Sequence, residues 1–232
     1  MDLIFEGIKQ AFFLLLHGDP HVLQVVLLSL GVSGGATLLS LCVGIPLGSV
    51  LGLTQFPGRR VIVSLINTGM GAPPVVVGLI ITIFLWRTGP LGITHLLYTP
   101  SAMVIAQFVI ALPLVAGFTL AAIQQLDPKL RLQILSLGAS RAQMVWLLLK
   151  EARLPLLAAV MAGFGAVISE VGASMMVGAN IKGETQVMTT AVVDATSRGE
   201  FDLAIAFSVI LMVLVYLVNF GLTTIQQRRK IR

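Results

Sequence analysis

Charged residues are scarce in this chain: they make up 11% of its 232 residues, about half the share that is usual in soluble domains. Four runs contain no charge at all, residues 20–58, 61–86, 88–126 and 203–227. Each run exceeds the roughly 20 residues that a helix needs to cross a membrane. This pattern excludes an ordinary soluble enzyme, a nucleic-acid-binding module and a disordered protein. The irregular spacing of the runs also argues against a membrane β-barrel.

Cysteine and nucleotide-binding signals are equally scarce. Cys42 is the single cysteine, so neither an intrachain disulfide nor a cysteine-based metal cluster can form. His17 and His21 are separated by Pro20, which breaks the helix that would align them, so we predict no zinc site. The chain has no glycine-rich loop ending in Gly-Lys-Ser or Gly-Lys-Thr that could hold the phosphates of ATP. We therefore predict no bound metal, no bound cofactor and no catalytic residue.

Apolar residues make up 56% of the chain, and their long runs predict an all-α integral membrane protein. We expect about five transmembrane helices, at residues 22–54, 60–86, 102–125, 154–178 and 203–226. Residues 2–17 place apolar and charged side chains on opposite helical faces, which predicts a short amphipathic helix at the membrane surface. The whole chain, 1–232, is thus interpreted as a single transmembrane domain embedded in a lipid bilayer.

Positive charge is unevenly distributed over the connecting segments. Eleven of the 15 lysine and arginine residues lie in or beside segments 55–59, 126–153 and 227–232. The other four lie in the N-terminal segment and in the opposite loops. Because basic loops remain in the cytoplasm, we expect segment 126–153 and the C-terminus inside the cell. The N-terminus and loop 179–202 should then lie outside a cell (inner) membrane. The net charge of +5 follows from this topology and requires no nucleic-acid partner.

Segment 126–153 has a helical pattern despite its charge. Asp127 and Pro128 suit a helix start, Gly138 interrupts the apolar pattern, and Ser140 can cap a second helix. We expect two short amphipathic helices that meet at an elbow facing the cytoplasm. The elbow is either an interfacial connector or a docking element for a cytoplasmic partner.

The elbow resembles the cytoplasmic coupling loop of ABC importer permeases. The residues that carry this resemblance are Leu137, Gly138, Ala139, Ser140 and Arg141. The Glu-Ala-Ala triplet that opens the family's signature is replaced here by residues 132–134, Leu-Gln-Ile. The resemblance implies the type I importer permease fold and coupling of the elbow to an ATPase subunit.

Two further stretches resemble the branch of this superfamily that transports molybdate, tungstate and sulfate. They are residues 72–79, Ala-Pro-Pro-Val-Val-Val-Gly-Leu, and residues 168–181, which begin Ile-Ser-Glu-Val-Gly-Ala. The second stretch is most similar to tungstate permeases, while molybdate and sulfate remain alternatives. The resemblance implies a homodimer that works with two ATPase subunits and an extracytoplasmic solute-binding protein. ATP and magnesium would be bound by the ATPase subunits.

Glu170 is the one charged residue between Arg153 and Lys182. A carboxylate inside a membrane costs on the order of 3 kcal/mol, so it requires a partner. We expect a structural acid that pairs with Arg87 or with free backbone N–H groups. A rival interpretation from another class is a secondary transporter that uses Glu170 for proton coupling.

Glycine and proline occupy two informative places within the predicted spans. Gly44, Gly48 and Gly52 recur every four residues, which lets two helices approach closely. We favour a helix-packing strip there over a wall of the substrate path. Pro73 and Pro74 interrupt the second span, where they free backbone carbonyls. A simple kink and a local opening along the substrate path are both compatible with this pair.

Uncharged polar side chains are expected near the outer mouth. Asn180, Thr185, Thr189 and Thr190 can donate hydrogen bonds to an oxyanion without trapping it, or they can cap an outer loop. A second pattern, Gly-x-Ser-x-Gly around Ser33, is shared with membrane serine proteases. A nucleophilic serine needs a base, and all three histidines fall in surface segments, so we give the protease interpretation little weight.

Overall fold

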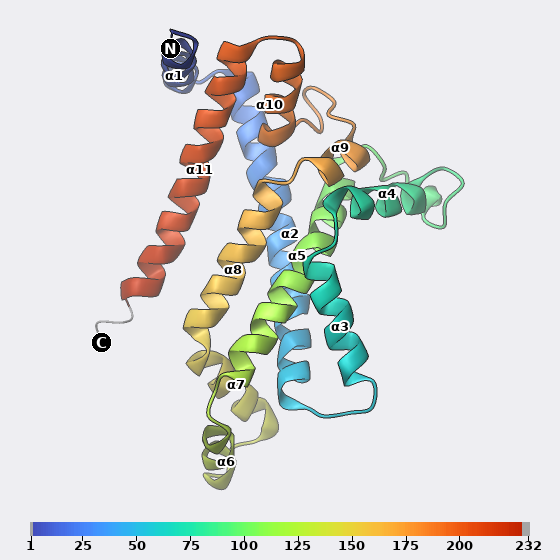
Figure 1. Ribbon diagram of the computed structural model, residues 1–232, viewed down its shortest axis with the longest axis vertical. Helices are drawn as coiled ribbons and strands as arrows, with labels where there is room; N and C mark the ends of the chain where they lie inside the picture. The colour runs from blue at the N-terminus through green and yellow to red at the C-terminus, as the bar shows by residue number, and fades with distance from the viewer. Residues whose placement is uncertain (1, 229–232) are drawn as a thin grey trace.

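The computed structural model describes residues 2–228, and their side chains except at positions 2–4, 15 and 228. The basic residues at 229–232 that contributed to the predicted orientation lie outside this range. The described part of the chain is helical, with α1 and α10 at one end and α6 and α7 at the other (Figure 1). Its elements are α1 (Asp2–Leu16), α2 (Pro20–Leu53), α3 (Arg59–Met70), α4 (Pro74–Leu85), the 3₁₀ turn η1 (Gly92–Thr94), α5 (Pro100–Gln124), α6 (Pro128–Ser136), α7 (Arg141–Glu151), α8 (Arg153–Ile168), α9 (Gly172–Gly178), α10 (Met188–Ser197) and α11 (Phe201–Arg228).

Three of the predicted spans are continuous helices. The helices α2, α5 and α11 are long and apolar enough to cross a membrane, which confirms the first, third and fifth spans. Proline at the first helical position and a polar cap before it define two of the starts. Asp19 accepts hydrogen bonds from the backbone N–H groups of His21 and Val22, and Thr99 accepts one from Ala102.

The second and fourth predicted spans are broken rather than continuous. The second consists of α3 and α4, which bend by 105°. The bend follows from Pro73 and Pro74, because a residue before proline avoids the helical conformation. The fourth ends as α8 at Ile168 and resumes as α9 at Gly172. In addition, α7 and α8 meet at 72°. The described residues therefore contain three continuous helices long and apolar enough to cross a membrane, or up to five such spans if each bent pair counts as one.

The glycine strip lies against α5. A Cβ atom built at Gly48 would stand 2.5 Å from the carbonyl oxygen of Ala116, and one at Gly44 would stand 2.9 Å from Val115. A Cβ atom at Gly52 would meet Ile123 at 2.7 Å. These distances are too short for any larger residue, so the strip brings the backbones of α2 and α5 into direct contact.

The first helix contacts the last. A Cβ atom at Gly7 would stand 2.5 Å from Ile205 of α11, and Ala11 is buried in the same region. Larger apolar side chains of α1, such as Phe12 and Leu16, are exposed. Helix α1 thus packs on α11 through its small residues. The sequence predicts a surface helix over 2–17 but not this contact with another helix.

Two short helices form segment 126–153. Asp127 accepts a 2.8 Å hydrogen bond from the N–H of Lys129 and caps α6. Ser140 and Gln143 form a reciprocal capping box at the start of α7. Ile134 of α6 and Met144 of α7 share an apolar cluster with the end of α5. The two helices that flank the elbow are therefore held in place by apolar packing against α5.

Candidate functional site

The two helix breaks line one cavity. Its volume is about 290 Å³, and its walls include Gly71, Pro73 and Pro74 from the α3–α4 break and Glu170 from the α8–α9 break. Leu114 of α5 contributes to the remaining wall. The sequence analysis singles out Pro73, Pro74 and Glu170 separately, but nothing in the sequence shows that the prolines and the acid share a cavity.

Glu170 uses its carboxylate to start a helix. The side chain is 8% exposed, and its Oε1 accepts a 2.8 Å hydrogen bond from the N–H of Ala173. A carboxylate at a helix N-terminus is stabilised by the unpaired N–H groups and by the helix dipole. Of the two expected partners, the structure supplies the free backbone N–H group.

The expected pairing of Glu170 with Arg87 does not form. Arg87 is exposed and follows α4, and it lines a different cavity together with Trp86 and His95. The only ion pair among the described residues joins Arg198 and Asp194. The physical reason is the 105° bend, which directs α4 sideways and carries the arginine away from the second break (Figure 1).

The helices that follow the two breaks are packed together. A Cβ atom at Gly78 of α4 would lie 2.7 Å from Cα of Ala173 in α9, and one at Gly172 would lie 2.6 Å from Val75. Thr82 also directs its hydroxyl toward the carbonyl of Met176 at 3.4 Å. A displacement of α9 must therefore displace α4, so the two walls of the cavity are mechanically linked.

Two of the threonines that the sequence analysis expects near the outer mouth bond to the protein's own backbone. Thr185 and Thr190 are fully buried, and their hydroxyls bond to backbone groups of Gly178, Ile181 and Val187. These two residues therefore build the loop and do not line an open path in this conformation. Of the two roles that the sequence analysis leaves open, these bonds match the capping of a loop, because small hydroxyl side chains close turns readily; the role in the substrate path stays a prediction.

Thr189 and Asn180 are placed differently. The hydroxyl of Thr189 donates a 3.0 Å hydrogen bond to the carbonyl of Glu170, joining α10 to the second break. Asn180 has a positive φ of 53°, and its Oδ1 is buried without a hydrogen-bond partner among the described residues. Of the four predicted polar residues, Thr189 is therefore the one that touches the cavity wall.

A buried glutamine, which the sequence analysis does not single out, connects three helices. Gln107 of α5 accepts a 3.1 Å hydrogen bond from Ser33 of α2 and donates a 3.2 Å bond to Ser174 of α9. All three side chains are at most 2% exposed. The only feature of the sequence that could have indicated this role is that Gln107 is a polar amide within the charge-free run 88–126. Ser33, the centre of the protease-like pattern, is therefore a structural hydrogen-bond donor.

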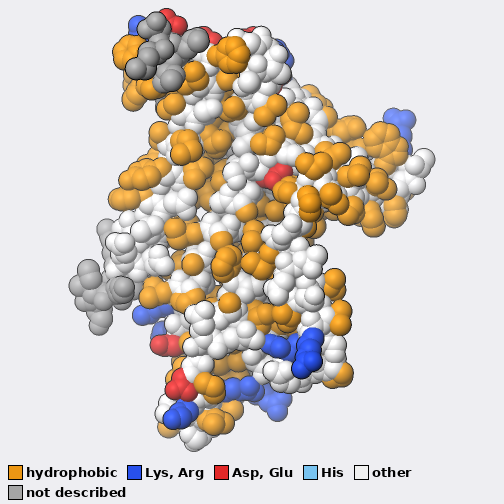
Figure 2. Space-filling view, in the orientation of Figure 1, with side chains coloured by type: hydrophobic (Ala, Val, Ile, Leu, Met, Phe, Trp, Pro, Cys, Tyr) orange, Lys and Arg blue, Asp and Glu red, His pale blue; other side chains and the backbone are white. Residues whose placement is uncertain are grey.

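The elbow residues lie at the opposite end of the molecule. Leu137 is 87% exposed, and Gly138 has a φ of 83°, which favours glycine. Apart from the two neighbouring residues in the chain, no described atom lies within 4 Å of a Cβ atom built on Gly138. Ser140 and Arg141 begin α7 directly after the turn. Lysine and arginine side chains gather around this end (Figure 2), so an apolar tip projects from a basic surface.

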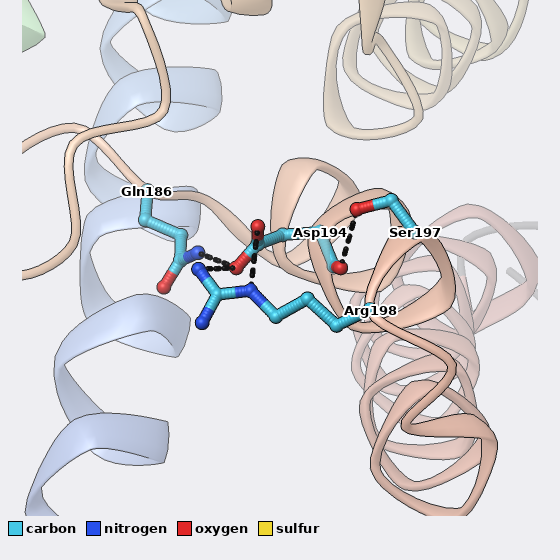
Figure 3. Close-up of polar contacts among 4 residues, drawn as sticks. All are labelled: Gln186, Asp194, Ser197 and Arg198. Carbon is cyan, nitrogen blue, oxygen red and sulfur yellow. Dashed lines mark hydrogen bonds and ion pairs between the residues drawn. The ribbon is translucent and has the colours of Figure 1, made fainter.

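The end opposite the elbow carries a polar cluster on and beside α10 (Figure 3). Arg198 forms an ion pair of 3.0 Å with Asp194. Gln186 reaches the same carboxylate at 3.5 Å, and the hydroxyl of Ser197 donates to the carbonyl of Asp194 at 2.7 Å. These contacts fix the second half of loop 179–202, in which the structure contains a helix that the sequence analysis did not expect.

The fold and the site define a polytopic helical membrane protein with two linked helix breaks and an exposed elbow at one end. The family model described as "binding-protein-dependent transport system inner membrane component" matches residues 44–231, and the chain belongs to this family. It is therefore a multi-pass membrane component of a binding-protein-dependent transport system.

Named relatives cover three quarters or more of the chain. The tungstate uptake system permease protein TupB of Peptoclostridium acidaminophilum is 37% identical over 98% of this chain and 100% of its own length. The TupB protein of Campylobacter jejuni is 36% identical over 95% and 92%. The molybdenum transport system permease protein ModB of Escherichia coli is 31% identical over 75% and 79%.

Solved structures share the fold. An inward-facing structure of the MetNI methionine ABC transporter matches with a TM-score of 0.75 at 21% identity, covering 89% of this chain and 95% of the other. A bacterial transporter for the import of alginate also matches with a TM-score of 0.75, at 19% identity over 93% and 82%. These matches confirm the predicted ABC type I importer permease fold.

Proposed function

We propose that this chain is the membrane-spanning subunit of an importer that carries tungstate into the cell. The observation that carries the proposal is the 37% identity to the tungstate permease of Peptoclostridium acidaminophilum over 98% of this chain and all of that relative. Molybdate is the second candidate, because it is also a tetrahedral dianion and a molybdenum permease is 31% identical. Sulfate is the third, since a sulfate permease of Synechocystis is 26% identical.

The energy for import would come from other subunits. The chain has no loop of the type that holds ATP phosphates, so we assign ATP and magnesium to two separate ATPase subunits. The exposed elbow of Leu137 and Gly138 is the proposed contact with them, because an apolar side chain 87% exposed at a loop tip gains most by inserting into a partner. A solute-binding protein would deliver the anion at the other end.

A second copy of the chain would complete the path. Helix α4 is apolar and lies at 105° to α3. Its side chains Val76, Ile80 and Ile83 are 48%, 48% and 56% exposed. This surface supports packing against a twin chain, with the anion passing between the two copies beside the cavity at the helix breaks. The orientation follows the distribution of basic residues: the elbow and the C-terminus inside, α1 and α10 outside.

The hydrogen bond that Glu170 accepts at the start of α9 argues against a proton-coupled secondary transporter. A proton relay needs a carboxyl group that can exchange its proton during transport, whereas this carboxylate accepts a hydrogen bond from the backbone N–H of Ala173.

Uptake into proteoliposomes tests the proposal. Vesicles containing this chain, its ATPase and external binding protein would be given tungstate, molybdate or sulfate at several concentrations, and internal metal or sulfur would be measured. We expect ATP-dependent uptake, with tungstate preferred at the lowest concentrations. A preference for sulfate over both metal oxyanions would refute the assigned substrate, and uptake without ATP would refute the class.

A further inference from the structure

A further cavity lies beside the elbow and is separate from the cavity at the helix breaks. It has a volume of about 550 Å³ and opens between the end of α2 and the helices α6 and α7. Pro46, Val50 and Leu135 contribute apolar wall, whereas Arg131 and Arg141 contribute positive charge. None of the described residues that line it is acidic. An apolar groove with two basic residues suits an amphiphile with a negative head.

The position of this cavity matches the boundary between membrane and water. Helix α2 has 34 residues and is thus about 51 Å long, whereas the hydrocarbon core is about 30 Å thick. The cavity borders only the last nine residues of this helix, 45–53, and Thr54 directly after it. On α7, Trp146 is 60% exposed and lies 5.1 Å below the ammonium group of Lys150. Exposed tryptophan is enriched at the membrane interface.

The two arginines keep donors available for a ligand. Nη1 of Arg131 donates a 2.8 Å hydrogen bond to the carbonyl of Leu53, which leaves most of its five N–H groups free. Asp127, one turn earlier, bonds to the N–H of Lys129 and forms no ion pair within the described chain. Arg141 is exposed at the start of α7. Neither guanidinium is therefore neutralised by a carboxylate of the described chain.

We propose that this cavity binds an anionic phospholipid of the cytoplasmic leaflet. The phosphate lies between Arg131 and Arg141, and an acyl chain follows the apolar surface of Pro46 and Val50. Basic pockets of this kind on the cytoplasmic side suit acidic lipid headgroups. The lipid would join the end of α2 to both helices of the coupling segment and so hold the elbow in position. The inference rests on the proposed orientation and is independent of the anion transported.

Lipid titration of the full chain in detergent, followed by native mass spectrometry, tests this site. Phosphatidylglycerol and phosphatidylcholine with identical acyl chains are the probes. We expect phosphatidylglycerol to bind preferentially. The double variant Arg131→Gln/Arg141→Gln should weaken that binding by about 25-fold, at about fivefold for each arginine near an anionic surface. Arg131→Lys/Arg141→Lys keeps the charge and should retain most of the preference.

The matched control is Arg60→Gln, which removes an exposed arginine at the same end that does not line the cavity. Equal binding of the two lipids, or an equal loss in the control, would overturn the proposal. The proposal would also be overturned if the double lysine variant lost as much phosphatidylglycerol binding as the double glutamine variant, because the positive charge is the proposed cause of binding. Competition by millimolar inorganic phosphate alone would assign the site to free phosphate. Displacement of the lipid by the partner ATPase would assign it to that protein.

Discussion

The backbone N–H of Ala173 donates a 2.8 Å hydrogen bond to Oε1 of Glu170, at the point where α8 has ended and α9 begins. Glu170 is 8% exposed and lines the cavity that also contains Pro73 and Pro74. One residue therefore starts a helix and forms a wall of the proposed path. This relationship gives an acid inside a membrane protein a structural reason to be there.

Removing this cap should destabilise the chain. We expect Glu170→Ala to lower the free energy of unfolding by about 2 kcal/mol, because a buried N–H loses a charged acceptor. Glu170→Gln keeps an acceptor oxygen and should cost less. Thermal unfolding of the purified chain in detergent measures both effects.

The same two variants separate structural and proton-coupling roles. In the capping role, Glu170→Gln retains most ATP-driven uptake in proportion to the folded protein recovered. If Glu170→Gln folds with unchanged stability yet loses all uptake, Glu170 acts in proton transfer and the cap is incidental.

The contact between α2 and α5 should tolerate no added methyl group. Gly48→Ala places a Cβ atom 2.5 Å from the carbonyl oxygen of Ala116, so we expect a loss of about 2 kcal/mol from overpacking. Gly34→Ala is the matched control on the same helix, because nothing lies within 4 Å of its Cβ position. Thermal unfolding should separate the two variants, and an equal melting temperature would show that α2 and α5 do not touch as described.

The long continuous helices could be predicted because composition decides them. Charge-free runs with a proline near their start, as at Pro20 and Pro100, leave a helix as the only way to satisfy the backbone in lipid. The break at Glu170 could not be predicted, because it depends on a hydrogen bond that the backbone N–H of Ala173 donates to the Glu170 side chain rather than on a helix-breaking residue. A local pattern does not encode that pairing.

The candidate site could be predicted only in part, because residue types can be read from the sequence and tertiary contacts cannot. Pro73, Pro74 and Glu170 stand out by residue type in their surroundings, but their shared cavity is a tertiary feature. Pairing with Arg87 was a reasonable expectation from charge alone and is wrong, because the 105° bend carries α4 away. Gln107 was overlooked because an amide within an apolar run carries no formal charge.

Thr189 should stabilise the link between α10 and the second break. Thr189→Val removes the 3.0 Å hydrogen bond to the Glu170 carbonyl and should cost about 1 kcal/mol. Thr196→Val removes an exposed hydroxyl that bonds only within α10 and is the control. Hydrogen exchange of residues 171–178 should accelerate in the first variant alone, and unchanged exchange there would count against the link.

Gly138 should be required for coupling rather than for folding. Its φ of 83° is unfavourable for a β-branched residue, so Gly138→Val should distort the elbow. We expect the complex to assemble while stimulation of ATP hydrolysis by the loaded binding protein is lost. Gly58→Val introduces the same strain, at φ 88°, in the α2–α3 loop and should leave stimulation intact. Equal effects in both variants would remove the special role of the elbow.

The central claim is tested most directly by ATP hydrolysis in proteoliposomes that contain this chain and its ATPase subunits. Binding protein is added empty, or loaded with tungstate, molybdate or sulfate. We predict that the tungstate-loaded form stimulates hydrolysis at the lowest anion concentration, and that the empty form does so least. The contrary result is a rate of ATP hydrolysis that no loaded form changes, measured on a complex shown to be assembled. That result would contradict the assignment of this chain as the permease of an oxyanion importer.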